Sequence, residues 1–303
     1  MRNSVLIDYF TYILMKILGW VASLLSPKFR GYLGMFIGYL LYFLPSKRKK
    51  IALHNLKIAF PGYLKGELNK IARKSFQNLS IVFIETAAAE FFSENDIIKL
   101  IKINNIDLVR QLLKKGNGLI FLSAHYGNWE YAAIAAGIYS KEPINVIVQK
   151  QKNKFVNKSI TKTRTKFGNK VVPMNSAARQ IIQSIKKNEA IAMLVDQSAK
   201  YGKDSFIDFF ATPALTYDAP AELALRFRTP IVYGFAFRNS DFTYTIDLKE
   251  LDFSDLSYSK ENVKILTRRH VEALEKQILK APELWVWEHK RWKYSVDYKK
   301  IER

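Results

Sequence analysis

The sequence predicts an α/β domain with a central, mostly parallel sheet flanked by helices, preceded by an N-terminal helical extension. After about residue 100, short apolar segments alternate with helical patterns, which is typical of such a sheet. The chain has 303 residues, of which 49% are hydrophobic, enough for a large core. We therefore expect a hydrophobic anchor over residues 1–46 and a main domain over 47–303, in which 47–99 form a helical lead-in and 100–303 the α/β core.

The first apolar segment, residues 4–25, is long enough to span a membrane, but it contains charged residues. Its polar and small residues recur every three or four positions and form one stripe along a helix: Asp8, Tyr12, Lys16, Gly19 and Ser23. This pattern favours a helix that lies in the membrane interface or packs on a polar partner. A true span and a soluble core helix are the alternatives. A cleaved signal peptide is not expected, because no small-residue cleavage site closes the run.

A second apolar segment, residues 31–44, carries no charge. As a helix it would be about 21 Å long, which is short for a hydrocarbon core of about 30 Å. Gly34 and Gly38 would allow it to approach the first helix closely. The basic residues 47–50 (KRKK) follow; they would attract anionic headgroups and would place this end at the cytoplasmic face. A solvated basic run is the alternative.

The rest of the chain shows helical and strand patterns in alternation. Helices are expected over 47–59 and 64–92, from 94, and over 128–140, 153–167, 176–187, 216–228 and 260–290. Strands are expected over 119–123, 144–149, 170–173, 190–195 and 231–237. Residues 242–248 alternate in polarity and are predicted to form an antiparallel edge strand.

Composition restricts the chemistry. With 48 Lys and Arg against 27 Asp and Glu, the net charge is +21, which calls for an anionic partner such as nucleic acid, an acidic protein or an anionic membrane. The chain has no Cys, which excludes disulfides, a Cys nucleophile and Cys-based metal sites. Only four His are present, so we expect no metal and no cofactor. Glycine-rich phosphate loops and the Gly-x-Ser-x-Gly elbow are also missing.

The segment 118–130 (GLIFLSAHYGNWE) is the strongest candidate for a reactive site. A strand leads into His125, and ligands of open α/β sheets bind at the carboxyl ends of strands. Asn128 is a good N-cap, which places Glu130 in the first turn of a helix. A turn at Gly127 would bring Glu130 to His125, so that the carboxylate fixes the tautomer and the other ring nitrogen accepts a proton from a hydroxyl. A structural histidine is the alternative reading.

Several ordered motifs resemble the late lipid A acyltransferases of bacterial lipopolysaccharide synthesis, part of the wider His-x4-Asp/Glu acyltransferase superfamily. The resemblance covers nearly the whole chain and rests on these segments: HYGNWE with His125 and Glu130; Asn55-Leu56 with Phe60-Pro61; Arg164-x3-Gly168; Asp196-Gln197; Phe209-Phe210-Ala-Thr-Pro213-Ala214; and Trp287-x-His289-x-Arg291-Trp292. Ala211 departs from the pattern, since the family often has Gly there.

The resemblance implies a glycerolipid-acyltransferase-like fold and a defined reaction. A fatty acyl group would move from acyl-acyl carrier protein to a hydroxyl of a lipid A precursor, at the cytoplasmic face of the bacterial inner membrane. His125 would be the general base, Glu130 its orienting partner, and attack on the thioester would be direct. The substrate-binding residues that it implies are Arg164, Asp196, Gln197, Asn128 and Gly127.

A basic helix follows the second predicted strand. Residues 141–170 contain nine Lys or Arg and one acidic residue. Lys150, Lys154, Lys158 and Lys162 recur every four positions and form a ridge suited to an acidic carrier protein or a phosphorylated lipid, with a solvated helix face as the alternative. Nucleic acid is not expected as a partner.

Three other functions stay open on the sequence. The same acyl group could go to a different glycolipid or hydroxylated membrane lipid, because a base needs only a hydroxyl. Water could be the acceptor, which would make the protein a hydrolase. A non-catalytic basic membrane-binding protein would depend on its Lys and Arg residues and not on His125.

Overall fold

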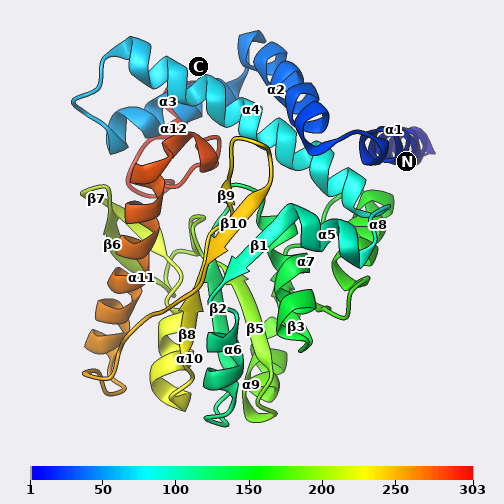
Figure 1. The fold of residues 1–303 in the computed structure, drawn as a ribbon. Helices are drawn as coiled ribbons and strands as arrows, with labels where there is room; N and C mark the ends of the chain where they lie inside the picture. Colours follow the sequence, from blue (N-terminus) through cyan, green and yellow to red (C-terminus); the bar gives the residue numbers. More distant parts are fainter. Residues whose placement is uncertain (1, 303) are drawn as a thin grey trace.

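The main sheet has six strands in the order β11-β8-β2-β5-β3-β4 in the computed structural model, which describes residues 2–302 (Figure 1). Its strands are β2 (Leu119–Ser123), β3 (Ile144–Val148), β4 (Lys170–Pro173), β5 (Ala190–Leu194), β8 (Ile231–Tyr233) and β11 (Lys249–Glu250). All neighbouring pairs are parallel except β11 with β8. The five predicted strands are therefore present, although the predicted strand at 231–237 ends early.

Two further sheets make the fold a mixed one. A three-stranded sheet has the order β1-β10-β9, and a hairpin joins β6 to β7. Their strands are β1 (Ile101–Asn104), β6 (Ser205–Phe209), β7 (Thr212–Thr216), β9 (Phe237–Arg238) and β10 (Tyr244–Asp247). The prediction of one central, mostly parallel sheet is thus confirmed only in part. The segment 242–248 is not an antiparallel edge strand, because β10 pairs in parallel with β1 on one side and antiparallel with β9 on the other.

Helices cover both faces of the main sheet. Alternate residues of a strand point to opposite faces, and because both sets are apolar here, both faces need a covering layer. On one face, Phe121 and Val146 pack with residues of α7; on the other, Ile120 and Ile191 pack with residues of α10 and α11. The helices after residue 100 are α6 (Asp107–Leu113), α7 (Trp129–Ser140), α8 (Lys154–Thr165), α9 (Ala177–Lys186), α10 (Ala219–Phe227), α11 (Lys260–Lys280) and α12 (Tyr298–Glu302), with 3₁₀ turns η1 (Met174–Ser176) and η2 (Pro282–Leu284).

The helix predicted over 260–290 ends at Lys280 in the structure. Pro282 disfavours helical geometry at the residue before it, Ala281, so the helix does not continue. The chain then continues as an irregular segment that crosses the molecule to the end of β2, where Tyr126 and Trp285 form an isolated antiparallel bridge.

The N-terminal helices lie across one end of the sheet (Figure 1). They are α1 (Arg2–Leu24), α2 (Pro27–Phe43), α3 (Lys47–Ala59), α4 (Lys65–Ala89) and α5 (Glu94–Leu100). Ser26, Ser46 and Ser93 cap the starts of α2, α3 and α5 with their side chains. Gly34 and Gly38 of α2 do permit a close helix contact, but the partner is α4 and not α1, because they face the backbone at Ile81 and Gln77.

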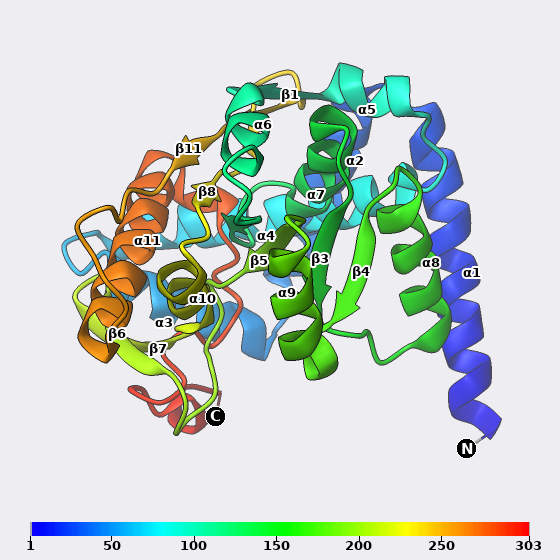
Figure 2. The same ribbon diagram turned by 90° about the horizontal axis from the view of Figure 1, so that it is seen from below.

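Helix α1 packs with its polar stripe against the rest of the protein. Lys16 Nζ lies 2.5 Å from a carboxylate oxygen of Glu90, and Gly19 lies against the backbone of Ala87. Figure 2 shows α1 alongside α8, where Tyr9 and Tyr12 contact the ring of Phe155. The prediction of a helix packed on a polar partner is therefore confirmed.

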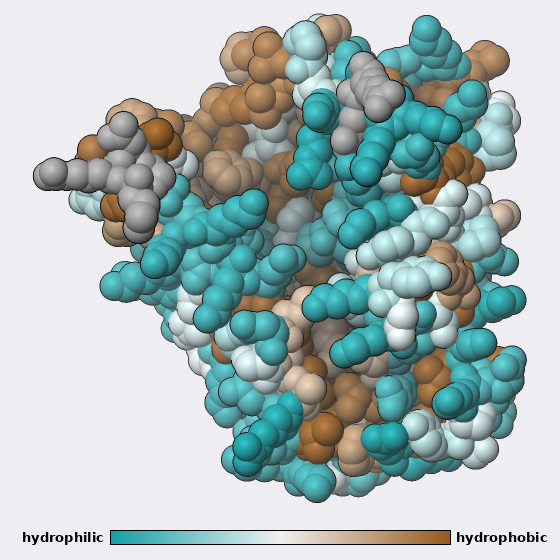
Figure 3. All heavy atoms as spheres, turned by 180° about the vertical axis from the view of Figure 1, so that it is seen from behind, coloured by the Kyte–Doolittle hydropathy of each residue, from teal (hydrophilic) through white to brown (hydrophobic). Residues whose placement is uncertain are grey.

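The opposite, apolar face of α1 is exposed. Leu6, Phe10 and Trp20 are 65%, 69% and 55% exposed, and Phe29 and Phe36 of α2 are similarly open. Within the described residues, Val5–Leu24 is the one helix that is long and apolar enough to cross a membrane. In Figure 3 apolar residues gather over this end of the molecule, and hydrophilic side chains lie around a recess on the same face.

The tight contact between α2 and α4 gives a stability prediction. A methyl group at Gly38 would overlap the backbone at Gln77, so Gly38→Ala should lower the free energy of unfolding by about 1–3 kcal/mol in a urea titration. Gly66→Ala, in the first turn of α4, is the matched control because no atom lies within 4 Å of its added methyl. An unchanged unfolding midpoint for Gly38→Ala would show that α2 does not pack in this way.

Candidate active site

His125 follows the carboxyl end of β2, and Asp196 follows the carboxyl end of the adjacent strand β5. The two strands pair in parallel, with Ser123 opposite Leu194, so the residues that follow both strands meet at one edge of the sheet. The ring nitrogen Nδ1 of His125 lies 2.8 Å from Asp196 Oδ1. The Nδ1–H therefore donates to the carboxylate, and Nε2 is left to act as a proton acceptor.

The Asp196 carboxylate receives two further hydrogen bonds. Its Oδ2 accepts the backbone N–H of His125 at 3.0 Å and the indole N–H of Trp285 at 2.8 Å. Asp196 and Trp285 are both buried, whereas the His125 side chain is 22% exposed. The carboxylate thus fixes both the ring and the backbone of His125 from behind.

Charge and burial act on this pair in opposite directions. Burial lowers the pKa of His125, but the attraction of the Asp196 carboxylate outweighs it, and the pKa is raised above its ordinary value; Glu130 contributes a smaller increase. Burial likewise raises the pKa of Asp196, while the charge of His125 and the hydrogen bonds from His125 and Trp285 lower it below its ordinary value. The imidazolium form of His125 is therefore stabilised.

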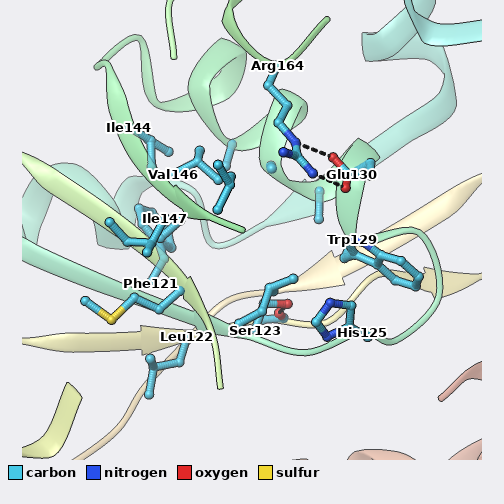
Figure 4. Close-up of a pocket in the computed structure, with 18 of the residues that line it drawn as sticks. Phe121, Leu122, Ser123, His125, Trp129, Glu130, Ile144, Val146, Ile147 and Arg164 are labelled. Atoms are coloured by element: carbon cyan, nitrogen blue, oxygen red, sulfur yellow. Dashed lines mark hydrogen bonds and ion pairs between the residues drawn. The ribbon is translucent and has the colours of Figure 1, made fainter. Parts of the chain in front are cut away.

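Glu130 does not orient His125 as the sequence predicts. Both of its oxygens receive hydrogen bonds from Arg164, from Nε at 2.7 Å and from Nη2 at 2.5 Å, in a bidentate ion pair between α7 and α8 (Figure 4). The position of Glu130 in the first turn of α7 is as predicted, but α8 brings an arginine to it. The carboxylate that contacts His125 is Asp196.

The loop from His125 to Asn128 is held by its backbone. Gly127 has φ +55°, and a methyl group there would overlap the carbonyl oxygen of Ala236, so only glycine fits. Asn128 caps α7 as predicted, since its Oδ1 accepts the N–H of Tyr131 at 2.9 Å, while its Nδ2 donates to buried Glu85 at 2.8 Å.

The C-terminal segment completes this support. Val286 N–H donates to the carbonyl of His125 at 3.1 Å, and Gly127 N–H donates to the carbonyl of Leu284 at 2.8 Å. On its other side, Asn55 of α3 donates to the carbonyls of Trp287 and His289, both at 2.7 Å. Asn55 and the C-terminal tryptophans, which are part of the resemblance, therefore support the His125 loop through this segment.

A cavity of about 360 Å³ extends from His125 into the space between the sheet and α7. Ser123, His125, Glu130, Arg164 and Gln197 line its polar part, with Gln197 Nε2 3.4 Å from His125 Nε2. Most of the other lining residues are apolar, and Figure 4 shows Phe121, Ile144, Val146 and Ile147 on the side of the cavity away from His125. Its apolar lining includes Ile103, Phe121, Ala132, Ala136, Ile144 and Val146.

The predicted substrate-binding residues divide into two groups. Arg164 and Gln197 line the cavity. Asn128 and Asp196 are buried and do not line it; their hydrogen bonds support the His125 loop from behind. Gly127 also acts through the backbone fold.

Three lysines of the predicted basic ridge, Lys154, Lys158 and Lys162, lie exposed on α8, and Lys162 is within 4.0 Å of Glu90. Lys150 is also exposed but precedes the helix, so it is not part of a helical ridge. Among the other histidines, burial lowers the pKa of His270 to about 3 and that of His289 to about 4, so both are neutral. Within residues 2–302 no group of three or more metal-ligating side chains converges.

Three contacts of the site are not predicted from the sequence: His125 with Asp196, Trp285 with Asp196, and Asn128 with Glu85. Asp196 had a usable signal, because it follows a predicted strand. Trp285 and Glu85 had none, since their contacts join segments far apart in the chain.

A histidine that is paired with a buried carboxylate at the polar end of an apolar cavity is an arrangement that suits an enzyme acting on a hydrocarbon chain. A model of the family described as bacterial lipid A biosynthesis acyltransferase matches residues 2–294. This chain belongs to that family and is an acyltransferase.

Individual relatives are distant but aligned over most of their length. A lipid A biosynthesis palmitoleoyltransferase of Escherichia coli (strain K12) is 23% identical over 265 residues, which are 86% of this chain and 84% of the relative. A lipid A biosynthesis acyltransferase of Haemophilus influenzae is 26% identical over 259 residues, 84% and 80% of the two chains. A lipid A biosynthesis lauroyltransferase of Escherichia coli (strain K12) is 22% identical over 261 residues, 86% and 84%.

The contact between His125 and Asp196 predicts a change in the histidine pKa. Asp196→Asn removes the charge that stabilises the imidazolium, so the pKa of His125 should fall. An NMR titration of the His125 ring measures it directly. Glu130→Gln is the control and should give a smaller decrease, because Glu130 acts on His125 only through space. A larger shift for Glu130→Gln would reverse the assignment of the partner.

The backbone of the His125 loop gives a second prediction. Gly127→Ala should destabilise the protein by at least about 3 kcal/mol, or displace the loop with loss of activity, because the added methyl overlaps the backbone at Ala236. Gly62→Ala, at a position with no atom within 4 Å of the new methyl, serves as the control for thermal unfolding and activity. Equal behaviour of the two variants would show that the loop has a different backbone path.

Proposed function

We propose that this acyltransferase transfers a fatty acyl group from acyl-acyl carrier protein to a hydroxyl of a lipid A precursor, with His125 as the general base. The observation that carries the proposal is the His125–Asp196 pair at the polar end of an apolar cavity. The family of the chain, and the substrates in the names of its relatives, support a lipid A precursor as acceptor.

In this mechanism Nε2 of His125 removes the proton from the acceptor hydroxyl as its oxygen attacks the thioester carbonyl. Asp196 keeps Nδ1 protonated and stabilises the imidazolium that forms. The C–S bond then breaks, and the departing thiolate takes the proton from Nε2, which returns His125 to its neutral state. The side-chain amide of Gln197, close to Nε2, is in a position to stabilise the negative charge on the carbonyl oxygen.

The other parts of the site have separate roles in the proposal. The acyl chain of the donor occupies the apolar part of the cavity, whose volume lies in the range of small-molecule sites. The Glu130–Arg164 pair holds α7 and α8 together at the polar part, and the guanidinium is a candidate to contact a phosphate or sugar carboxylate of the acceptor. The lysine ridge of α8 suits an acidic carrier protein.

The N-terminal helices support membrane association in this proposal. The apolar faces of α1 and α2 are exposed, and α2 ends next to the basic residues 47–50, a combination that suits the cytoplasmic face of the bacterial inner membrane. A chain that acylates a lipid needs such a surface, because its acceptor stays in the bilayer.

Loss of the base tests the proposal. Purified protein in detergent micelles is incubated with labelled acyl-acyl carrier protein and a lipid A precursor, and the lipids are separated by chromatography. His125→Ala and Asp196→Asn should lower the transfer rate at least about 100-fold, because each removes proton transfer by a correctly oriented imidazole. His54→Gln, a histidine that does not line the cavity, is the control and should behave as the wild type.

Other results point to the competing functions. Consumption of the thioester with an unchanged precursor would indicate a different hydroxylated lipid or water as acceptor. Undiminished activity in His125→Ala, or membrane binding without any thioester consumption in the wild type, would contradict the general-base mechanism.

A further inference from the structure

A second hollow of about 210 Å³ lies between α1, α4 and α8, outside the apolar part of the main cavity. Its walls are mainly apolar and come from all three helices: Met15 of α1; Leu79, Val82, Phe83 and Ala87 of α4; Val156 and Ile160 of α8. We call this space the α1–α4–α8 groove. The mechanism described above makes no use of it.

The groove and the main cavity meet at the active site. Trp129, Glu130 and Gln151 line both. The ring of Trp129 lies 5.0 Å from the ring of His125 between centroids, so the junction is close to the base. Two apolar spaces therefore diverge from one polar centre, one beneath α7 and the other beneath α1.

The two carboxylates that line the groove, Glu90 and Glu130, are already paired. Glu90 lies at its wall, where Ser159 Oγ and Lys16 Nζ each contact one carboxylate oxygen at 2.5 Å. Burial raises the pKa of Glu90, but these hydrogen bonds and the nearby lysines outweigh it, and Glu90 remains ionised within a neutralised cluster. The surface that the groove offers to a ligand is therefore apolar.

The groove is also open toward the apolar exterior. Phe83, in its wall, is 55% exposed, and α1, which forms one side, has its apolar face outward. A hydrocarbon chain can therefore enter laterally from the surface that we assign to the membrane, without crossing water. The lining residues of the main cavity come mainly from the sheet and α7, and none of them lies on α1 or α4.

Direct transfer of an acyl group requires donor and acceptor at His125 together. If the donor chain fills the main cavity, the acceptor chain needs a second apolar space that begins at the same point. A hydroxyl carried along an acyl chain, as in a 3-hydroxyacyl group, leaves most of that chain beyond the reacting oxygen. The α1–α4–α8 groove is the space that meets this requirement.

We propose that the α1–α4–α8 groove binds the hydrocarbon tail of the hydroxyacyl chain whose hydroxyl is acylated. This inference rests on the proposed function and adds to it the subsite that selects a lipid acceptor.

Filling the groove tests the inference kinetically. Ile160→Trp and Val156→Trp place bulk in the groove and should raise KM for a hydroxyacylated glucosamine disaccharide about tenfold, since they remove apolar contact with its tail. KM for the acyl-carrier-protein donor should stay within about twofold of the wild type. Thr165→Trp, an exposed position on the same helix, is the matched control and should leave both constants unchanged.

A variant of the other space gives the opposite result. Ala136→Phe fills the apolar part of the main cavity and should shift the donor preference to shorter acyl chains, while KM for the acceptor is retained. Equal acceptor KM values in the wild type and both groove variants would overturn the inference and leave the proposed function intact. Failure of the wild type to acylate the disaccharide would overturn both.

A photolabel locates the tail of the hydroxyacyl chain in the wild-type protein. The result therefore does not depend on whether a variant folds correctly. The disaccharide carries a diazirine at the end of one 3-hydroxyacyl chain and is irradiated with the wild type in the presence of donor. Labelled peptides should contain residues 79–87 or 156–163. Labels confined to residues 132–148 would contradict the inference. A diazirine phospholipid is the control: if it labels the groove as strongly as the disaccharide does, and the disaccharide does not displace it, the inference is also contradicted.

Discussion

The Asp196 carboxylate is the group on which the rest of the active site depends. It accepts hydrogen bonds from the ring and the backbone of His125 and from the indole of Trp285, so it joins two segments that lie far apart in the sequence. A buried charge of this kind is stable only because each oxygen is satisfied. The requirement fixes the relative positions of β2, β5 and the C-terminal segment, and it stabilises positive charge on His125.

The helices α3 and α4 are connected to the Asp196–His125 pair through the C-terminal segment. Asn55 of α3 and Asn78 of α4 bind the carbonyls of the C-terminal segment, which in turn binds the His125 loop. Helices α3 and α4 are therefore connected to the His125 loop through one short segment. Helix α1 has the reverse of the polarity expected in a soluble protein, with its polar stripe inward on α4 and α8. That arrangement makes sense where the outer solvent is lipid.

Local patterns were enough to predict much of this architecture. The strand at 119–123, the Asn128 cap and the polar stripe of α1 each depend on neighbouring residues, and each is present as predicted. The prediction of Glu130 as the partner of His125 is wrong, because the partner depends on which strand lies beside β2. Glu130 instead forms an ion pair with Arg164, 34 positions further along the chain. The β6–β7 hairpin and the three-stranded sheet are not predicted, since the pairing of their strands depends on tertiary contacts.

The pH dependence of kcat/KM for acyl transfer tests the central claim most directly. A general base must be neutral to accept a proton, so kcat/KM should rise with pH through the pKa of His125, which Asp196 holds above its ordinary value. The rising limb should coincide with the pKa that NMR gives for the His125 ring in the free protein. A rate that is independent of pH across that pKa, or that falls as the imidazole becomes neutral, would contradict the account.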